Sequence, residues 1–491
     1  MAWPQTPVVY EINTAVWLDA LSRRTGHSVR LGDVSAADWD AVTPDGADAV
    51  WLMGVWERSP AGLAVARANH ALMASFREAL PDLRNDDVVG SPYCVRRYVV
   101  DASFGGREGL AAARAALAAR GLRLLLDHVP NHVAPDHPWV TEHPERLIRG
   151  SADDAAADPA GWMTVGSSVV AHGRDPYFPP WPDVVQLNAF APELRAATAD
   201  TLADIADQCD GIRCDMAMLM TNDVFAKTWG SRAGQQPVDE FWPEVIATLR
   251  ARHPDTVLVA EAYWDLEWQL QQQGFDFCYD KRLCDRLVEG DTDGVRNHLR
   301  ADLAYQAKLL RFLENHDEPR IASRVGRDVE RAAAVTVATL PGATLWHDGQ
   351  FEGRTVRPPV FLRRRPDEPA DAELADWYAR LLRVVAHDEV RAGTWRLLEA
   401  IGWPDNGTCR NLVAWSWEGG AHHRGHLVVV NLSGAPAQGT VRVPWSDVAG
   451  RRWRLRDSLH GVDLERDGDE LAGPGLFVAL DAWQSHVFAL D

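Results

Sequence analysis

Short apolar runs rich in β-branched residues alternate with longer amphipathic segments along most of the chain. A segment rich in Ala, Leu and Arg, such as Arg107–Arg120, is typical of a helix, whereas the short apolar runs predict buried strands. The predicted strands are Val8–Ile12, Ala49–Met53, Leu122–Leu126, Gly211–Cys214, Thr256–Ala260, Phe275–Cys278, Lys308–Leu313 and Ala343–Trp346. Eight strands that alternate with helices over roughly 380 residues predict an α/β fold, a (β/α)8 barrel with insertions.

The chain departs from this alternation in two places. Between the third and fourth predicted strands lie about 80 residues rich in Pro, Gly, Asp and Trp, which is far longer than an ordinary loop and predicts a functional excursion from the barrel. After about residue 390 the pattern changes to short alternating strands separated by turn residues, which predicts a small antiparallel β domain. These strands are predicted at Leu412–Trp417, His426–Asn431, Gly439–Val443, Arg452–Arg456, Leu476–Leu480 and Ser485–Leu490.

The composition excludes several classes of protein. A chain of 491 residues predicts two or three domains, and 46% hydrophobic with 24% charged residues is typical of a folded protein in water. The formal net charge of -20 argues against nucleic acid as a partner, because phosphate binding needs a surplus of Lys and Arg. No apolar run is long enough for a membrane span, so no membrane partner is expected either.

The N-terminal residues and the cysteines predict a cytoplasmic protein. The sequence MAWPQTPVVYEI has no basic region followed by an apolar core, so no secretory signal is expected. The six cysteines form no CxxC pair and no metal-like cluster with His, which is typical of reduced thiols. The 21 tryptophans favour sugar binding only weakly, because core packing is the better explanation for most of them.

Candidate chemistry follows the ends of four predicted strands, where barrel enzymes carry their catalytic groups. The candidates in chain order are Asp127, His128, His132, Arg213, Asp215, Glu261, His316 and Asp317. Each has a structural alternative: Asp215 could be a helix N-cap, Glu261 could pair with a nearby Arg, and His316 could be a buried core histidine. The coincidence of so many such groups at the end of one predicted barrel favours a common site.

The sequence around Asp215 and around Glu261 predicts a different charge for each of these two carboxyl groups. Residues two apart on a strand face the same way, so Arg213 and Asp215 are expected to point into the same space. The guanidinium would lower the pKa of Asp215 and keep it ionised, as a nucleophile must be. Glu261 follows the apolar run TVLVA, where burial would favour its protonated form. One charged and one neutral carboxyl group is the division of roles in glycosidic bond cleavage.

The four segments that carry these residues resemble the four conserved regions of the α-amylase family, glycoside hydrolase family 13, in order and at the expected strands. The segments are Asp127–His132, Gly211–Met216, Glu261–Trp264 and Phe312–Asp317. Further agreement comes from Gly90–Tyr93, Tyr98, Phe104–Gly106, Asp183–Asn188 and Leu340–Gly342. The resemblance implies a TIM barrel formed by residues 1–132 and 191–390, an inserted domain B at 133–190 and a C-terminal antiparallel β-sandwich, domain C, at 391–491.

The resemblance also implies a role for each candidate. Asp215 is expected to be the nucleophile, Glu261 the general acid/base and Asp317 the stabiliser of the transition state. The expected substrate-binding residues are Tyr93, Asp127, His132, Arg213 and His316. Asp127 and Arg213 would order the nucleophile, the two histidines would bind the donor glucosyl unit, and Tyr93 would form the platform under that sugar.

The sequence departs from the starch-degrading members of the family just after Asp215. Many of those enzymes carry a Lys-His pair that serves acceptor binding and a calcium site, whereas this chain has Met216–Leu219. We therefore expect no metal and no cofactor, and an oligosaccharide or a small α-glucoside as the substrate in place of long starch. The expected activity is retaining hydrolysis of α-glucosidic bonds in maltooligosaccharides or related α-glucosides. The sequence indicates no oligomeric state.

Two other classes of function stay open. An α-glucan transglycosylase, of the glucanotransferase, maltosyltransferase or trehalose-forming type, would use the same carboxylates and differ only in its acceptor pocket. An inactive carbohydrate-binding scaffold is the more remote alternative, because such proteins usually lose a catalytic carboxylate and this chain keeps all three. A metal-dependent barrel would need converging ligands, and His128 and His132 lie on a strand-to-loop turn where they need not converge.

Overall fold

Eight parallel strands close into a barrel in the computed structural model, which describes residues 3–386, 390, 393–419 and 425–491. The strands are β1 (Val8–Asn13), β2 (Ala49–Met53), β5 (Arg123–His128), β10 (Gly211–Cys214), β11 (Val257–Ala260), β12 (Phe277–Tyr279), β13 (Leu309–Arg311) and β14 (Ala343–His347). Each strand pairs with the next one along the chain, and β1 closes the ring against β14. The predicted barrel is confirmed, and each predicted strand lies within two residues of an observed one.

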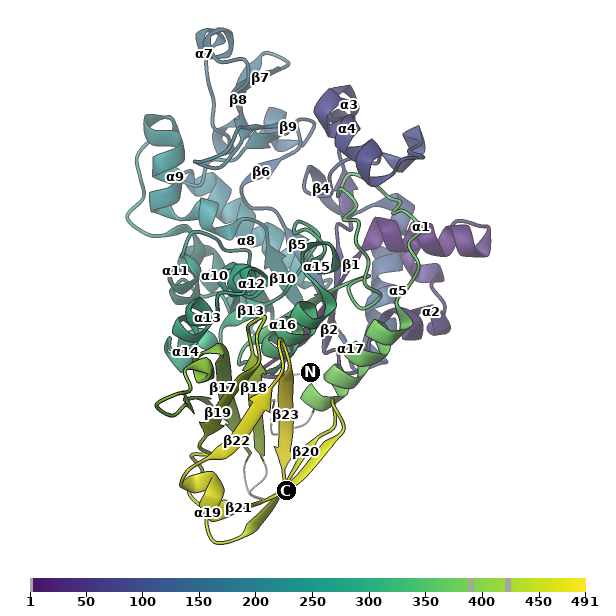
Figure 1. Ribbon diagram of the computed structural model, residues 1–491. Coiled ribbons are helices and arrows are strands. Elements are labelled where there is room, and N and C mark those ends of the chain that lie inside the picture. The colour runs from purple at the N-terminus through teal and green to yellow at the C-terminus, as the bar shows by residue number, and fades with distance from the viewer. Residues whose placement is uncertain (1–2, 387–389, 391–392, 420–424) are drawn as a thin grey trace.

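Helices surround the barrel (Figure 1). They are α1 (Thr14–Thr25), α2 (Ala36–Val42), α5 (Gly106–Ala118), α8 (Pro192–Ala206), α10 (Phe241–Arg252), α11 (Glu267–Gln272), α12 (Lys281–Glu289), α13 (Thr292–His298), α14 (Leu303–Gln306), α15 (Ile321–Arg324), α16 (Arg327–Thr339) and α17 (Ala372–Val385). The helix predicted at Arg107–Arg120 is α5, which ends two residues earlier and is followed by the left-handed Gly121. None of the helices in the described part of the chain is long and apolar enough to cross a bilayer.

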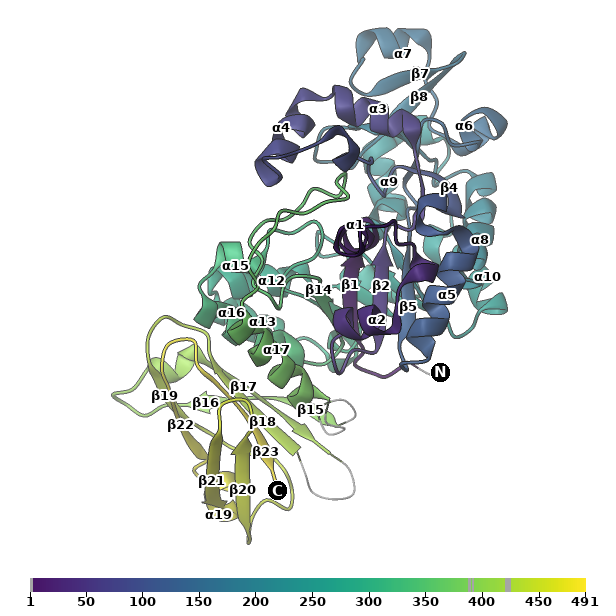
Figure 2. The same ribbon diagram turned by 90° about the vertical axis from the view of Figure 1, so that its right-hand side faces the viewer.

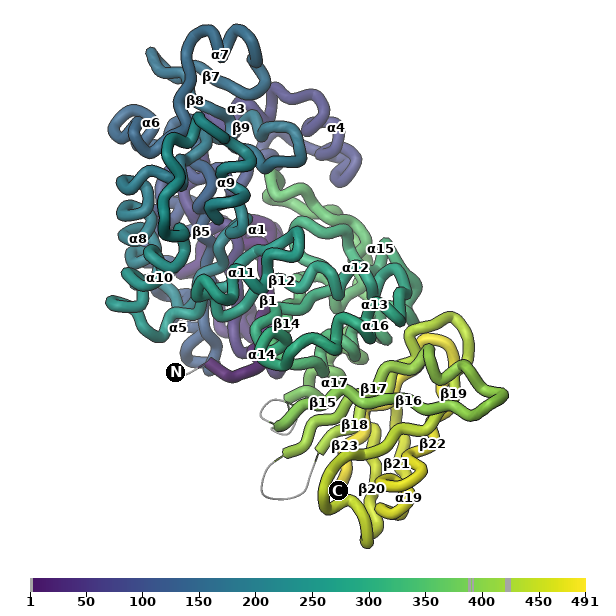
Figure 3. Tube along the Cα trace, turned by 90° about the vertical axis from the view of Figure 1, so that its left-hand side faces the viewer, coloured from purple at the N-terminus to yellow at the C-terminus, as the bar shows by residue number. Residues whose placement is uncertain are grey.

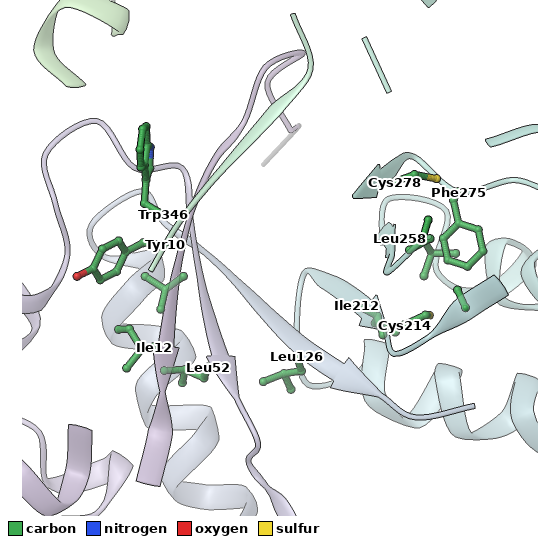
Figure 4. Close-up of a cluster of buried hydrophobic side chains, with 14 of the residues drawn as sticks. Tyr10, Ile12, Leu52, Leu126, Ile212, Cys214, Leu258, Phe275, Cys278 and Trp346 are labelled. Atoms are coloured by element: carbon green, nitrogen blue, oxygen red, sulfur yellow. The ribbon is translucent and has the colours of Figure 1, made fainter. Parts of the chain in front are cut away.

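Strand side chains alternate between the outside and the inside of the barrel, as the two-residue period of a strand requires. Outward side chains such as Tyr10, Leu52 and Ile212 belong to the large core shared with the helices (Figure 4). The barrel interior is filled by a separate cluster that includes Val9, Trp51, Leu125, Val259, Tyr279 and Leu345. Residues two positions beyond these interior residues continue the inward face, and they include Glu11, Asp127, Glu261 and His347.

Two excursions gather at the end of the barrel where the strands end (Figures 1 and 2). The first follows β2 and contains β3 (Trp56–Arg58), α3 (Pro60–Ala68), α4 (His70–Ala79) and β4 (Val95–Val100). The second follows β5 and contains β6 (His132–Val133), α6 (Trp139–Glu142), α7 (Ala152–Ala157), β7 (Trp162–Val165), β8 (Ser168–Gly173) and β9 (Trp181–Gln186). Its strands form an antiparallel sheet in the order β6-β9-β8-β7, which the aperiodic sequence did not predict.

Two antiparallel sheets form the C-terminal part of the chain, at the lower end of the molecule in Figures 1 and 3. One has the order β15 (Thr394–Leu398), β17 (Leu412–Glu418), β18 (Gly425–Asn431), β23 (Ser485–Leu490), β20 (Arg452–Asp457) and β21 (Val462–Asp467). The other has the order β16 (Ala400–Ile401), β19 (Ala437–Val441) and β22 (Leu476–Leu480), and the short helix α19 (Gly468–Ala472) follows β21. The predicted β domain is confirmed.

The C-terminal sheets pack on the barrel through α16. The indole N–H groups of Trp415 and Trp417 both donate to the carbonyl oxygen of Thr339, at 3.2 and 2.7 Å, where that helix ends. The strand predicted at Gly439–Val443 is β19, shifted by two residues. The domain boundary expected at residue 391 lies outside the described residues.

Candidate active site

One guanidinium binds two carboxylates at the ends of neighbouring barrel strands. Arg213, on the inward face of β10, is fully buried. Its Nη1 donates to Asp215 Oδ1 at 2.6 Å, and its Nη2 donates to Glu261 Oε2 at 2.7 Å. Because the guanidinium is a rigid planar fork, both carboxylates must lie side by side against it. The sequence predicted the Asp215 contact, whereas the Glu261 contact was only the structural alternative for that residue.

The rest of the Arg213 side chain is enclosed by polar and aromatic groups. Its Nε donates to the hydroxyl of Tyr279 at 3.3 Å. The rings of Trp51, Tyr93 and Tyr279 lie 5.2, 5.3 and 5.7 Å from the guanidinium carbon. Asp127 is more distant than the other two carboxylates, with Oδ1 3.8 Å from Nη1, and its Oδ2 accepts the backbone N–H of Gly54 at 2.8 Å. Asp127 therefore fixes the backbone after β2 more directly than it fixes Arg213.

Glu261 is arranged so that one of its oxygens can carry a proton. Its Oε2 accepts both from Arg213 and from the backbone N–H of Met216 at 2.7 Å, whereas Oε1 contacts the hydroxyl of Tyr263 at 2.8 Å. Burial, together with the charges of Asp215 and Asp317, raises the pKa of Glu261 to about 7, against the opposing effect of Arg213. Since two donors already occupy Oε2, the proton of the neutral form must lie on Oε1.

The pKa of Asp215 differs in direction from the sequence-based expectation. Arg213 does lower it, as expected, but burial is the larger effect, and the neighbouring Asp317 and Asp127 add to it. The net result is a pKa raised from its ordinary value. The prediction took account of the partner charge at Asp215 but not of the cost of burying the carboxylate.

A second group of site residues is centred on His316. Its Nδ1 lies 2.5 Å from Glu11 Oε1, and its Nε2 lies 2.8 Å from the Tyr93 hydroxyl and 2.9 Å from Asp317 Oδ2. Burial would lower the pKa of His316, but Asp317 and Glu11 outweigh it and raise the pKa well above its ordinary value. Burial would raise the pKa of Asp317, but the charge and the hydrogen bond of His316 outweigh burial and lower this pKa to about 2. The Asp317 side chain is itself 47% exposed.

His132 lies apart from the carboxylates. It begins β6, where its ring packs against Trp181 at 5.2 Å, and burial lowers its pKa to about 4. Within the described residues no hydrogen bond or ion pair joins His132 to Asp215, Glu261 or Asp317. The structure thus brings together Tyr93, Asp127, Arg213, Asp215, Glu261, His316 and Asp317, and places His132 at the edge of this group.

The backbone and side-chain oxygens of Asn131 and the carbonyl oxygens after Asp215, which could hold a metal near the site, already accept hydrogen bonds. Asn131 O and Oδ1 both lie 2.9 Å from Gln186 Nε2. In the segment after Asp215, the carbonyl oxygens of Met216, Ala217 and Met218 accept from Leu219 N, Trp242 Nε1 and Thr221 N. These contacts do not favour a cation in this position.

Several residues in contact with the site were absent from the sequence-based candidates. They include Glu11 in β1, Trp51 in β2, Tyr279 at the end of β12, and Tyr263 two residues after Glu261. Each could have been found from the two-residue period, because each has the inward parity of its strand or follows a candidate by two positions. They were not recognised because they lie in apolar or aromatic runs of the sequence, which are typical of core residues.

A cavity of about 640 Å³ opens beside His316 and Asp317. Its other walls come from α4, with Leu72, Ser75 and Phe76, and from the segment 355–361 after β14. Arg357 in that segment lines the cavity and donates to the carbonyl oxygen of Asp317. Of the candidate site residues, His316 and Asp317 line this cavity, which therefore reaches the exposed side of Asp317.

The fold and the site define a (β/α)8-barrel protein in which one buried arginine binds two carboxylates at the ends of neighbouring strands. No family model matches the sequence. The chain is 24% identical over 390 residues to the α-amylase MalA of Haloarcula japonica, covering 76% of this chain and 48% of the relative. It is 26% identical over 435 residues to an α-1,4-glucan:maltose-1-phosphate maltosyltransferase of Burkholderia pseudomallei, covering 80% of this chain and 34% of the relative.

Solved structures share the fold from end to end. The maltogenic α-amylase AmyB of Thermotoga neapolitana superposes with a TM-score of 0.69 at 18% identity, covering 99% of this chain and 98% of that one. An α-amylase of H. orenii gives a TM-score of 0.69 at 19% identity over the whole of both chains. In sequence and in fold the chain is thus similar to members of the α-amylase family. It spans about half the length of the first curated relative and about a third of the second.

Proposed function

We propose that this protein is a retaining α-glycosidase that cleaves α-glucosidic bonds of maltooligosaccharides or related α-glucosides. Asp215 is the nucleophile, Glu261 the general acid/base and Asp317 the group that stabilises the transition state. The observation that carries the proposal is the single guanidinium of Arg213 bound to both Asp215 and Glu261. Two carboxylates held by one fork favour the close spacing of retaining enzymes, about 5–5.5 Å, over the roughly 6.5–9.5 Å of inverting ones.

The proton positions support the same division of roles. With a pKa of about 7, Glu261 is largely protonated below neutral pH, and its proton lies on the oxygen that does not face Arg213. Asp215 keeps the hydrogen bond and the charge of Arg213, which favour its ionised form against burial. One carboxyl group can therefore give a proton while its neighbour supplies an electron pair.

The reaction follows in two steps. In the first, an oxygen of Asp215 attacks the anomeric carbon, the glycosidic C–O bond breaks, and Glu261 gives its proton to the departing oxygen. In the second, the ionised Glu261 takes a proton from water, whose oxygen attacks the same carbon and releases Asp215. Two displacements at one carbon keep the α-configuration. Asp317, beside the imidazolium of His316, offers negative charge where the sugar ring becomes cationic.

Transfer to a sugar is the second candidate, and the similarity to a maltosyltransferase favours it. The same glycosyl-enzyme would then be attacked by a sugar hydroxyl in place of water. The acceptor side would be formed by Tyr177 and Trp264, whose rings meet at 4.7 Å, with Lys227 over the Tyr177 ring. Of these three, Tyr177 comes from residues 133–190, which would act as domain B, and residues 391–491 would act as domain C. A cytoplasmic location remains part of the proposal.

Product analysis by NMR tests the function. The full chain is incubated with maltotriose, and the first-formed anomer is recorded before mutarotation; we expect the α-anomer. Maltose, trehalose, sucrose and maltose-1-phosphate, each with and without a maltooligosaccharide acceptor, then separate release of glucose or maltose from lengthening of the acceptor. First formation of the β-anomer would overturn the retaining mechanism, and no turnover of any α-glucoside would overturn the proposal as a whole.

A further inference from the structure

Three side chains with metal-ligand atoms meet in the C-terminal sheet, outside the candidate active site. Asp457 ends β20, His460 lies in the turn between β20 and β21, and His486 lies on β23. Asp457 Oδ2 is 2.9 Å from His460 Nδ1 and 2.9 Å from His486 Nδ1, and one ligand atom from each of the three residues lies within 4.8 Å of the other two. Of the described residues, only these form such a group of three.

Asp457 is held in the orientation of a ligand. Its side chain is fully buried, and its Oδ1 accepts the backbone N–H groups of Leu459 and His460 at 3.0 and 3.1 Å. This turns Oδ2 toward the two imidazoles, with the backbone N–H of Val487 a further 3.3 Å contact. Oδ2 therefore faces both imidazole nitrogens, the position that a carboxylate ligand of a shared ion must take.

We propose that Asp457, His460 and His486 bind one divalent transition-metal ion, with Zn²⁺ as the best fit. Two imidazole nitrogens and one carboxylate oxygen are a donor set typical of Zn²⁺ and its neighbours, whereas Ca²⁺ and Mg²⁺ prefer oxygens alone. Each imidazole would bind as the neutral tautomer that carries its one proton on Nε2, which leaves the Nδ1 lone pair for the ion. Water supplies the further ligands, because the side chains of His460 and His486 are 34% and 20% exposed.

The geometry needs only a small adjustment for this. Tetrahedral zinc with bonds of about 2.0–2.1 Å places ligand atoms roughly 3.3–3.4 Å apart. The two carboxylate–imidazole contacts are a few tenths of an ångström shorter than this, and the whole group lies within 4.8 Å. His460 is in a turn and can move outward, while His486 is fixed by pairing of β23 with β18. Leu459, in the same turn, is buried in the large core that also contains Val385 of α17. A bound ion would thus tie the turn to β23 beside the surface that packs on the barrel.

Zinc binding by the full chain tests the proposal. The protein is stripped with a chelator, dialysed and titrated with Zn²⁺ by calorimetry, and its thermal unfolding is followed with and without Zn²⁺. We expect one Zn²⁺ per chain and a rise in melting temperature of several degrees. His460→Ala and His486→Ala should each weaken binding by at least about tenfold and remove the rise in melting temperature. His70→Ala, which changes an exposed histidine at the start of α4, is the matched control and should behave as the wild type.

The alternative is a metal-free cluster in which both histidines donate to Asp457. A metal-free cluster also predicts that the His460 and His486 variants are less stable than the wild type, so melting temperatures measured without metal do not distinguish it from a zinc site. The change in melting temperature on adding Zn²⁺ does distinguish them. A wild-type chain whose melting temperature does not respond to Zn²⁺, or variants at His460 and His486 that bind Zn²⁺ as tightly as the wild type, would overturn the proposal. Replacement by Co²⁺ gives an independent readout, because coordination by these ligands produces visible absorption bands that the His486→Ala variant should lack.

Discussion

Glu11 Oε1 lies 2.5 Å from His316 Nδ1, so the first barrel strand is joined directly to the segment that carries Asp317. Glu11 is fully buried, and its other oxygen has no hydrogen-bond partner, so this contact is its main role in the site. Because Nδ1 is occupied by Glu11, the Nε2 of His316 is left to face Tyr93 and Asp317. Two flanking carboxylates also keep the imidazole positively charged against the effect of burial.

Glu11→Gln should lower activity by acting through His316. The amide keeps the shape and can still accept a hydrogen bond, but it removes one of the two negative charges that raise the pKa of His316. As that pKa falls, the imidazolium is lost at lower pH, so a second ionisation should steepen the alkaline limb that Glu261 sets near pH 7. We expect kcat/KM at neutral pH to fall by roughly 10- to 100-fold, or about 1.4 to 2.8 kcal/mol.

Glu330→Gln is the matched control for this variant. Glu330 on α16 is also a buried glutamate, but its partner is the hydroxyl of Tyr378 at 2.9 Å, in the helical layer. That substitution should leave the pH profile of the folded enzyme unmoved. A Glu11→Gln enzyme with the wild-type kcat/KM and alkaline limb would show that Glu11 only fills space.

The strands were predictable because their apolar runs are bounded by helical segments. The carboxylates were predictable because they follow those runs. The residues that each carboxylate contacts could not be predicted from the sequence. Arg213 binds Glu261 as well as Asp215 because β10 and β11 pair with Arg213 opposite Val259, and this register cannot be read from one sequence. β21 was missed for another reason: its sequence VDLERD is mostly polar, so it carries no core-facing signal. Glu11 was missed inside the apolar first strand, although its parity marks it as inward.

Calcium should have no effect on this protein at the position where some relatives bind it. Asn131 O and Oδ1 are both occupied by Gln186, and the carbonyl oxygens after Asp215 accept other donors. Adding Ca²⁺ to the chelator-treated, dialysed protein should change neither kcat nor the melting temperature by more than about 1 °C. A Ca²⁺-dependent gain that Asn131→Ala removes would contradict this expectation.

Glu261→Gln should separate proton donation from nucleophilic attack. The amide cannot give a proton to a sugar leaving group, so turnover of maltooligosaccharides should fall by roughly 10²- to 10⁴-fold. An α-glucosyl fluoride needs little protonation to leave and should still form the covalent glycosyl-enzyme, seen by mass spectrometry as an adduct on the peptide that contains Asp215. Glu267→Gln, a buried glutamate at the start of α11, should leave both reactions unchanged. Near-native hydrolysis of oligosaccharides by Glu261→Gln would exclude it as the acid.

Arg213→Leu should move both limbs of the pH profile in the same direction. The guanidinium lowers the pKa of Asp215 and that of Glu261, because it is bound to both. Activity requires ionised Asp215, so the acid limb lies at the pKa of that group and should rise when Arg213 is removed. Activity also requires protonated Glu261, so the alkaline limb, near pH 7 in the wild type, should rise as well.

The same substitution leaves two buried carboxylates without their shared cation, so we expect kcat/KM to fall by roughly 10²-fold or more in the folded variant. Arg311→Leu is the matched control, because Arg311 is a buried barrel arginine whose partner is Asp280, 3.2 Å away. If Arg213 serves only to support the fold, both variants will lose folded protein, and the surviving enzyme will keep its two limbs in place. If Arg213 sets the charge of the pair, only Arg213→Leu will shift them, and the direction will be upward for both. A shift of one limb alone would mean that the guanidinium controls a single carboxylate, which contradicts the fork seen in the structure.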